Sequence, residues 1–102
     1  MFVHTVFFWM NPGVSDADRK QLVNDCLRYL GKCSTVRQIW AGPPAQTPRE
    51  VVDNSYDVGL TVVFDDKAGH DAYQEDPSHL EFIRRNKQHW QRVQIYDFIQ
   101  PK

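Results

Sequence analysis

The first residues of the chain form a run that is apolar on both of its faces. Residues 2–10, FVHTVFFWM, are rich in aromatic and β-branched side chains, which predicts a β-strand. Alternate positions, counted from Phe2 or from Val3, would point to opposite sides of a sheet, and both sets are largely apolar. A strand with one face in water should instead alternate with polar residues. Both faces of this strand therefore need a cover.

Helical and strand-like patterns follow in turn along the chain. Ser15 and Asp18 form a plausible capping box for a helix over residues 16–30, and Gly31 ends it. Five apolar residues at helical spacing would give that helix its buried face: Leu22, Val23, Cys26, Leu27 and Leu30.

The second half of the chain contains three more strands and a broken helix. The strands are predicted over residues 35–41, 56–64 and 92–99. Asp65 or Asp66 would cap a short helix that Pro77 interrupts, and Ser78 would cap a further helix from His79 to about Gln88. Leu80, Phe82 and Ile83 are the residues that this last helix could bury.

This order is β-α-β-β-α-β, with the second helix broken at Pro77. It predicts a single α+β domain over residues 1–102 with a ferredoxin-like fold, a four-stranded antiparallel sheet with helices on one face. The helices can cover only that face. We expect a second copy of the same sheet to cover the other, which gives a homodimer with a shared barrel-like interior. The alternative is a monomer with an exposed apolar patch.

Composition and charge narrow the classes of partner. The net charge of -1 does not favour a polyanion, and the predicted open face of residues 56–64 offers no aromatic side chain for stacking a base, so no nucleic acid is expected. No apolar run approaches the ~20 residues of a membrane span. Residues 1–5 lack the marks of a signal peptide, which predicts a cytoplasmic protein without a membrane partner. Cys26 and Cys33 are predicted to be free thiols.

Three polar residues are candidates for one acid–base site. His4 would share the helix-covered face of the first strand with Val6, while Tyr73 and His79 flank the break between the two short helices. An imidazole can take a proton near pH 7, and a phenol can orient a carbonyl oxygen. A helix N-terminus disfavours imidazolium, so His79 would remain a neutral base. The alternative is that all three are ordinary core or surface residues.

Several stretches resemble the stress-responsive A/B barrel (Dabb) family of dimeric α+β barrels. They are HTVFFWM near the N-terminus, YDVGLTVVFDD, the YQEDPSHLEF break with Tyr73, Pro77 and His79, and IYDF near the C-terminus. The resemblance implies a homodimer whose biochemical activity is unassigned. A plant polyketide cyclase of this family works without a cofactor. By position, its base matches His79, and its orienting groups match Tyr73 and His4.

No metal site or cofactor is predicted. The histidines at positions 70, 79 and 89 have no partner histidine four residues away, and Asp71 and Asp76 do not form a ligand set. Two classes of function remain. One is a small-molecule binding protein, with a small hydrophobic or aromatic carbonyl compound as its ligand. The other is a cofactor-free cyclase, lyase or isomerase that uses His79 as base, with Tyr73 and His4 orienting the substrate.

Overall fold

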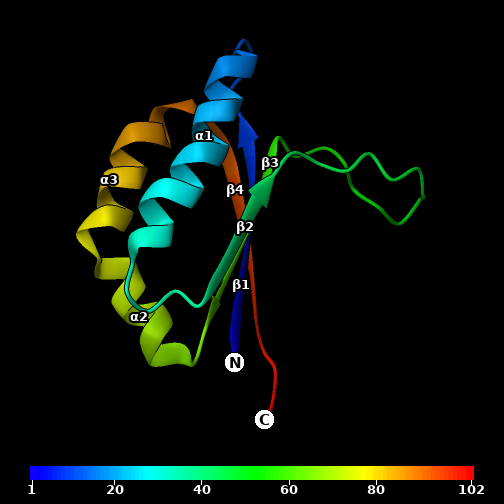
Figure 1. Ribbon diagram of the computed structural model, residues 1–102. Coiled ribbons are helices and arrows are strands. Elements are labelled where there is room, and N and C mark those ends of the chain that lie inside the picture. Colours follow the sequence, from blue (N-terminus) through cyan, green and yellow to red (C-terminus); the bar gives the residue numbers. More distant parts are fainter.

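The computed structural model describes residues 1–102 and contains one sheet covered by helices on one side (Figure 1). The sheet is antiparallel throughout, in the strand order β2-β3-β1-β4. This confirms the predicted ferredoxin-like α+β arrangement. No helix has the length and apolar character needed to cross a membrane. The elements in chain order are β1 (Phe2–Met10), α1 (Asp16–Tyr29), η1 (Leu30–Lys32), β2 (Gln38–Gly42), β3 (Val58–Phe64), α2 (Lys67–Glu75), α3 (Pro77–Asn86), η2 (Lys87–His89) and β4 (Trp90–Ile99).

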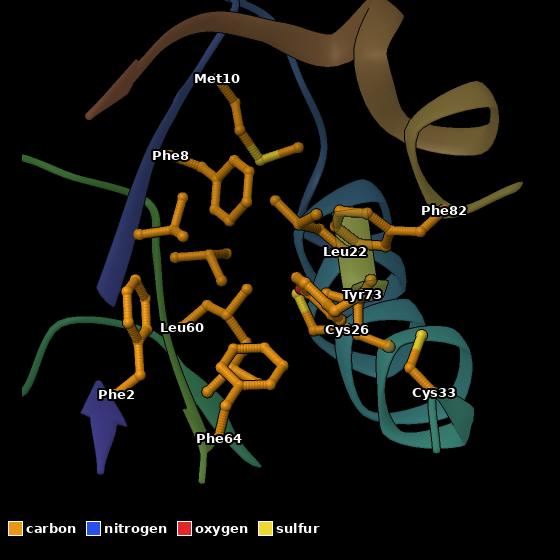
Figure 2. Packing of buried hydrophobic residues seen from close by; sticks show 14 residues of the cluster. Phe2, Phe8, Met10, Leu22, Cys26, Cys33, Leu60, Phe64, Tyr73 and Phe82 are labelled. Carbon is orange, nitrogen blue, oxygen red and sulfur yellow. The ribbon is translucent and has the colours of Figure 1, made fainter. Parts of the chain in front are cut away.

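The core lies between the sheet and the helices. Alternate residues of β1 and β3 face the helices, and there they meet side chains from α1, α2 and α3 (Figure 2). Tyr73 and Phe82 reach toward the sheet from the helix layer, opposite Phe8, Leu60 and Phe64 (Figure 2). Strand β1 pairs with β3 on one side and β4 on the other, so a residue of β1 that faces the helices lies at the centre of the core.

The first helix begins as predicted and buries a narrower stripe than predicted. Ser15 and Asp18 form the capping box, with each side chain bonded to the other's backbone N–H. Leu22 and Cys26 are buried, whereas Leu27 is 43% exposed and does not belong to the core. One residue after Cys26, a side chain is turned by about 100° around the helix, which carries Leu27 off the apolar stripe.

The break between α2 and α3 differs from the sequence prediction by two residues. Asp76, and not Ser78, is the N-cap of α3, because its carboxylate accepts the backbone N–H of Ser78 at 2.8 Å. Pro77 is the first residue of α3. At that position a helix leaves the backbone N–H without a partner, so the missing N–H of proline costs no hydrogen bond. Leu80 was a candidate for burial and is 55% exposed.

The second face of the sheet has no helix on it and carries aromatic residues. We call this surface the open face. Phe7 and Trp9 of β1 are half-buried there, in part by Tyr56 of the loop before β3. The register places Trp40 of β2 and Tyr96 and Phe98 of β4 on the same side. The prediction that no aromatic is available for stacking was therefore right for β3 only.

A long loop between β2 and β3, residues 43–57, projects from the body of the molecule. In Figure 1 it extends away from the helices, on the side of the open face. It is anchored where it meets β3, since the indole N–H of Trp9 donates to Ser55 at 2.9 Å and the carboxylate of Asp57 accepts the Met10 N–H at 2.7 Å.

Candidate functional site

The three candidate residues come from three elements that meet inside the core. His4 is on the central strand β1, Tyr73 is near the end of α2, and His79 is in the first turn of α3. The helix break at Asp76 and Pro77 turns the chain so that residues from both short helices face β1. His4 is on the helix-covered face, as predicted, because it alternates with Phe2 and Val6.

The structure brings the three side chains around one cavity. The ring centroids of His4 and Tyr73 are 6.1 Å apart, and those of Tyr73 and His79 are 4.7 Å apart. All three line a cavity of about 160 Å³ between the sheet and the helices. Most of the other lining residues are apolar, and they include Phe8, Phe82 and Trp90. The space that a purely structural core would fill is therefore partly open.

His79 is held as a neutral imidazole at the cavity wall. Burial lowers the pKa of His79, the neighbouring His4 adds to this effect, and the carboxylate of Asp76 opposes it. Its Nδ1 atom is buried and has no hydrogen-bond partner. A neutral, desolvated imidazole with an unengaged nitrogen can accept a proton or a hydrogen bond from a bound molecule.

Tyr73 is a hydrogen-bond donor that stays protonated. Its side chain is 1% exposed and packs between Phe64 and His79. Burial raises the pKa of Tyr73 well above its ordinary value, and the thiols of Cys26 and Cys33 act in the same direction. A phenol in this state can orient or stabilise a carbonyl oxygen but cannot serve as a base near neutral pH.

His4 has a carboxylate partner that the sequence argument did not identify. Its Nδ1 lies 2.6 Å from Oδ1 of Asp97, the residue directly opposite it on β4. Burial lowers the pKa of His4, and the hydrogen bond to Asp97 works against this effect. In neutral His4 the Nδ1–H donates to Asp97, so Nε2 is the nitrogen left to accept a hydrogen bond.

A second histidine lies beside this pair. His70 of α2 stacks on Phe2 with ring centroids 4.6 Å apart, and its centroid is 5.0 Å from that of His4. One ligand atom each from His4, His70 and Asp97 lies within 4.8 Å of the other two. This cluster could not be predicted from spacing along the sequence, because its three residues come from β1, α2 and β4.

One of the two residues that were missed, Asp97, carried a signal in the sequence, and the other, Trp90, did not. Asp97 is the one charged residue among Val93, Ile95 and Ile99 on its face of β4, which matches the position of His4 among the apolar residues of β1. Trp90 lines the cavity and its indole nitrogen is buried without a partner. It precedes the strand that was predicted from position 92, so only the observed register places it beside Phe8.

Asp25 of α1 is buried and has a structural role. It is 4% exposed, and its carboxylate accepts hydrogen bonds from Arg85 at 2.9 Å and from Asn86 at 3.0 Å. These contacts join α1 to the end of α3. They place the Asp25 carboxylate in an ion pair and not at the cavity.

The element order and the strand order define the class: a small α+β protein with a four-stranded antiparallel sheet of ferredoxin-like topology and helices on one face. The chain belongs to the stress-responsive A/B barrel domain (Dabb) family, whose model matches residues 2–100. No protein with a curated description matches the chain.

Solved structures agree with this membership at the level of the fold. A Dabb family protein with a ferredoxin-like fold from Mesorhizobium loti has 22% identity and a TM-score of 0.79, over 99% of this chain and 97% of that one. A hydroxynitrile lyase from Passiflora edulis has 15% identity and a TM-score of 0.83, over 99% and 94%. A dimeric ferredoxin-like protein of unknown function from Thermobifida fusca has 16% identity and a TM-score of 0.80, over 95% and 88%.

Proposed function

We propose that this protein is a homodimer that binds a small, largely apolar molecule carrying a carbonyl group in the cavity beneath its sheet. The cavity of about 160 Å³, with His4, Tyr73 and His79 in an otherwise mostly apolar wall, is the observation that carries the proposal. An engineered cavity of about 150 Å³ in another protein binds benzene, so a single aromatic ring fits such a volume. The polar groups would fix the orientation of the ligand.

The dimer would form through the open face. Tyr96 and Phe98 on this surface are 61% and 57% exposed, and Trp40 is 56% exposed. An apolar patch of this kind usually marks an interface, and a second copy offers a self-complementary surface around a two-fold axis. Several solved relatives are described as dimers, which supports the same assembly here. The buried free thiols Cys26 and Cys33 are compatible with action in the reducing cytoplasm.

The binding proposal is tested with acetophenone, an aromatic ketone of suitable size. We expect amide and side-chain NMR shifts at Tyr73, His79 and Trp90 when the ligand is added, and none at Leu80 on the outer surface of α3. Ligand-induced shifts confined to the open face, or no shift at millimolar ligand, would contradict binding in the cavity.

A second candidate function is cofactor-free acid–base catalysis of the cyclase, lyase or isomerase type. The neutral His79 with an unengaged nitrogen, next to a phenol that stays protonated, favours it. His79 would take a proton from the carbon beside the substrate carbonyl, and the electron pair would move to the carbonyl oxygen. The Tyr73 hydroxyl would hydrogen-bond this enolate oxygen, and His4 Nε2 would accept a hydrogen bond from a substrate hydroxyl.

This candidate is tested by hydrogen–deuterium exchange at the methyl group of acetophenone in D₂O. His79→Gln should slow the exchange that the protein catalyses by about 10²-fold or more, which is a usual contribution of a general base. Tyr73→Phe should slow it while leaving ligand binding largely intact. His89→Gln is the matched control, because His89 lies in η2 and does not line the cavity. Exchange no faster than in buffer would rule out this chemistry on the probe and leave the binding proposal in place.

A further inference from the structure

Two imidazoles and a carboxylate converge where β1, β4 and α2 meet. The groups belong to His4, Asp97 and His70, and one ligand atom from each lies within 4.8 Å of the other two. We propose that these three residues form a binding site for a divalent transition-metal ion of the Zn²⁺ or Co²⁺ type. Neither the site nor the ion follows from the acid–base chemistry proposed above, in which His79 is the base and Tyr73 the donor; the two sites share only His4.

The fold fixes two of the ligands relative to each other. His4 and Asp97 are directly opposite in the β1–β4 register, so both side chains emerge on the helix-covered face. His4 Nδ1 lies 2.6 Å from Asp97 Oδ1, so the two atoms are already close enough for one ion to contact both. A metal ion bound there would replace the proton that the two groups now share, so binding would release a proton.

The contacts of His70 assign a role to each of its ring nitrogens. Nδ1 is 3.1 Å from the carboxylate of Asp71, and Nε2 is 3.3 Å from the amide nitrogen of Gln74. One neutral tautomer satisfies both contacts, with Nδ1–H donating to Asp71 and Nε2 accepting from Gln74. Nε2 would then be the ligand atom, and a bound ion would displace the amide of Gln74 from it. A carboxylate behind the other nitrogen, as Asp71 is here, commonly orients a metal-binding histidine.

The ligand set selects the class of ion. Two imidazole nitrogens and one carboxylate oxygen suit Zn²⁺, Co²⁺ and similar ions, whereas Mg²⁺ and Ca²⁺ prefer oxygen ligands alone. Bonds of about 2.0–2.2 Å would draw the ligand atoms closer together than they are now. The side chains of His70 and Asp97 are 16% and 36% exposed, so they would make this adjustment rather than His4, which is 4% exposed and held in the core. Three protein ligands leave a coordination position for water or a small ligand.

The test uses the full chain without an affinity tag, because a histidine tag would bind the same ions. Isothermal titration with ZnCl₂ should show one ion per chain, and Co²⁺ should give a visible absorption spectrum without thiolate charge-transfer bands. His70→Gln should weaken binding at least ten-fold, since it removes one of three ligands. Asp97→Asn is a second variant with the same expectation, should the first fail to fold.

Two matched variants locate the ion. His89→Gln and His79→Gln should bind Zn²⁺ as the wild type does, because neither histidine belongs to the cluster. The proposal is overturned by the absence of one-to-one binding in the wild type, by undiminished affinity in His70→Gln, or by thiolate bands that place the ion at Cys26 or Cys33. The His79→Gln variant separates this result from the proposed catalysis, because it should lose proton exchange and keep the metal.

Discussion

The ring of Tyr73 stands edge-on to the ring of His79, with centroids 4.7 Å apart and planes at 72°. One helix ends and another begins between these two residues. The contact exists because the extended backbone of Asp76 ends α2 and Pro77 begins α3, so that the last turn of α2 and the first turn of α3 line the same cavity. The helix break is therefore what assembles the candidate site.

The ionisation of His79 provides a direct test of its surroundings. We expect NMR titration of the imidazole to give a pKa below 6.5, its ordinary value, because burial and the nearby His4 disfavour the charged form. A histidine whose pKa is lower in the folded state binds fewer protons there than in the unfolded chain. Its contribution to stability is therefore complete above pH 6.5 and is lost as the pH falls below that value.

The corresponding measurement is the free energy of unfolding between pH 7 and pH 5. Wild type should lose stability over this range, and His79→Gln should lose less of it. His4, whose pKa burial also lowers, keeps part of the dependence in the variant. A measured pKa of His79 at or above 6.5 would show that the imidazole is exposed to solvent and not held in the cavity wall.

The N-cap of α3, the carboxylate of Asp76, should contribute measurably to the free energy of unfolding. Asp76→Ala removes the carboxylate that accepts the Ser78 N–H, and we expect a loss of about 1 kcal/mol, as for other helix N-caps. In a chain of this length that loss lowers the melting temperature by several degrees. Glu75→Ala, one residue earlier on the exposed end of α2, is the control and should change the melting temperature little. Equal effects of the two substitutions would mean that the cap is not formed.

Breaking the buried contact of Asp25 with α3 should lower the free energy of unfolding more than removing the Asp76 cap does. Asp25→Ala leaves Arg85 without its carboxylate partner and Asn86 with only the Phe82 carbonyl, and we expect a loss of about 2–3 kcal/mol in urea unfolding. Arg85 is partly exposed and can recover water, which keeps the loss below that of a fully buried pair. Glu81→Ala breaks the exposed pair with Arg84 and should lower the free energy of unfolding much less than Asp25→Ala does, because water screens exposed charges.

The fold could be read from the sequence because its signals are local. The alternation of β1 and β3, the capping box of Ser15 and Pro77 at the helix break each depend on residues that are close together in the chain, and each lies where it was predicted. The errors are also local. Ser78 resembles a cap as strongly as Asp76 does, and only the observed backbone decides between them.

The site could be predicted only in part because its contacts are distant in the sequence. His4, Tyr73 and His79 were candidates by residue type, and the structure places them at one cavity. The pairing of His4 with Asp97 depends on the register of β4, and the approach of His70 depends on the packing of α2. Neither follows from spacing along the chain, which is why the metal-ligand cluster went undetected.

Assembly through the open face is tested with one residue of that face and a matched residue elsewhere. Phe98 is 57% exposed on β4, and Leu80 is 55% exposed on the outer side of α3. Phe98→Asp would place two like charges near each other across a two-fold interface and desolvate both, so we expect the dimer to weaken at least ten-fold. Light scattering after size-exclusion chromatography should then report a monomer of about 12.0 kDa.

Leu80→Asp adds the same charge at a site of nearly equal exposure and should leave the dimer intact. A dimer that survives Phe98→Asp and dissociates with Leu80→Asp would move the interface to the helical side. The cavity has to be judged separately, because it lies beneath the helix-covered face of the sheet. We therefore expect the Phe98→Asp monomer to keep its folded core and to bind acetophenone, which would show that the ligand site is complete within one chain.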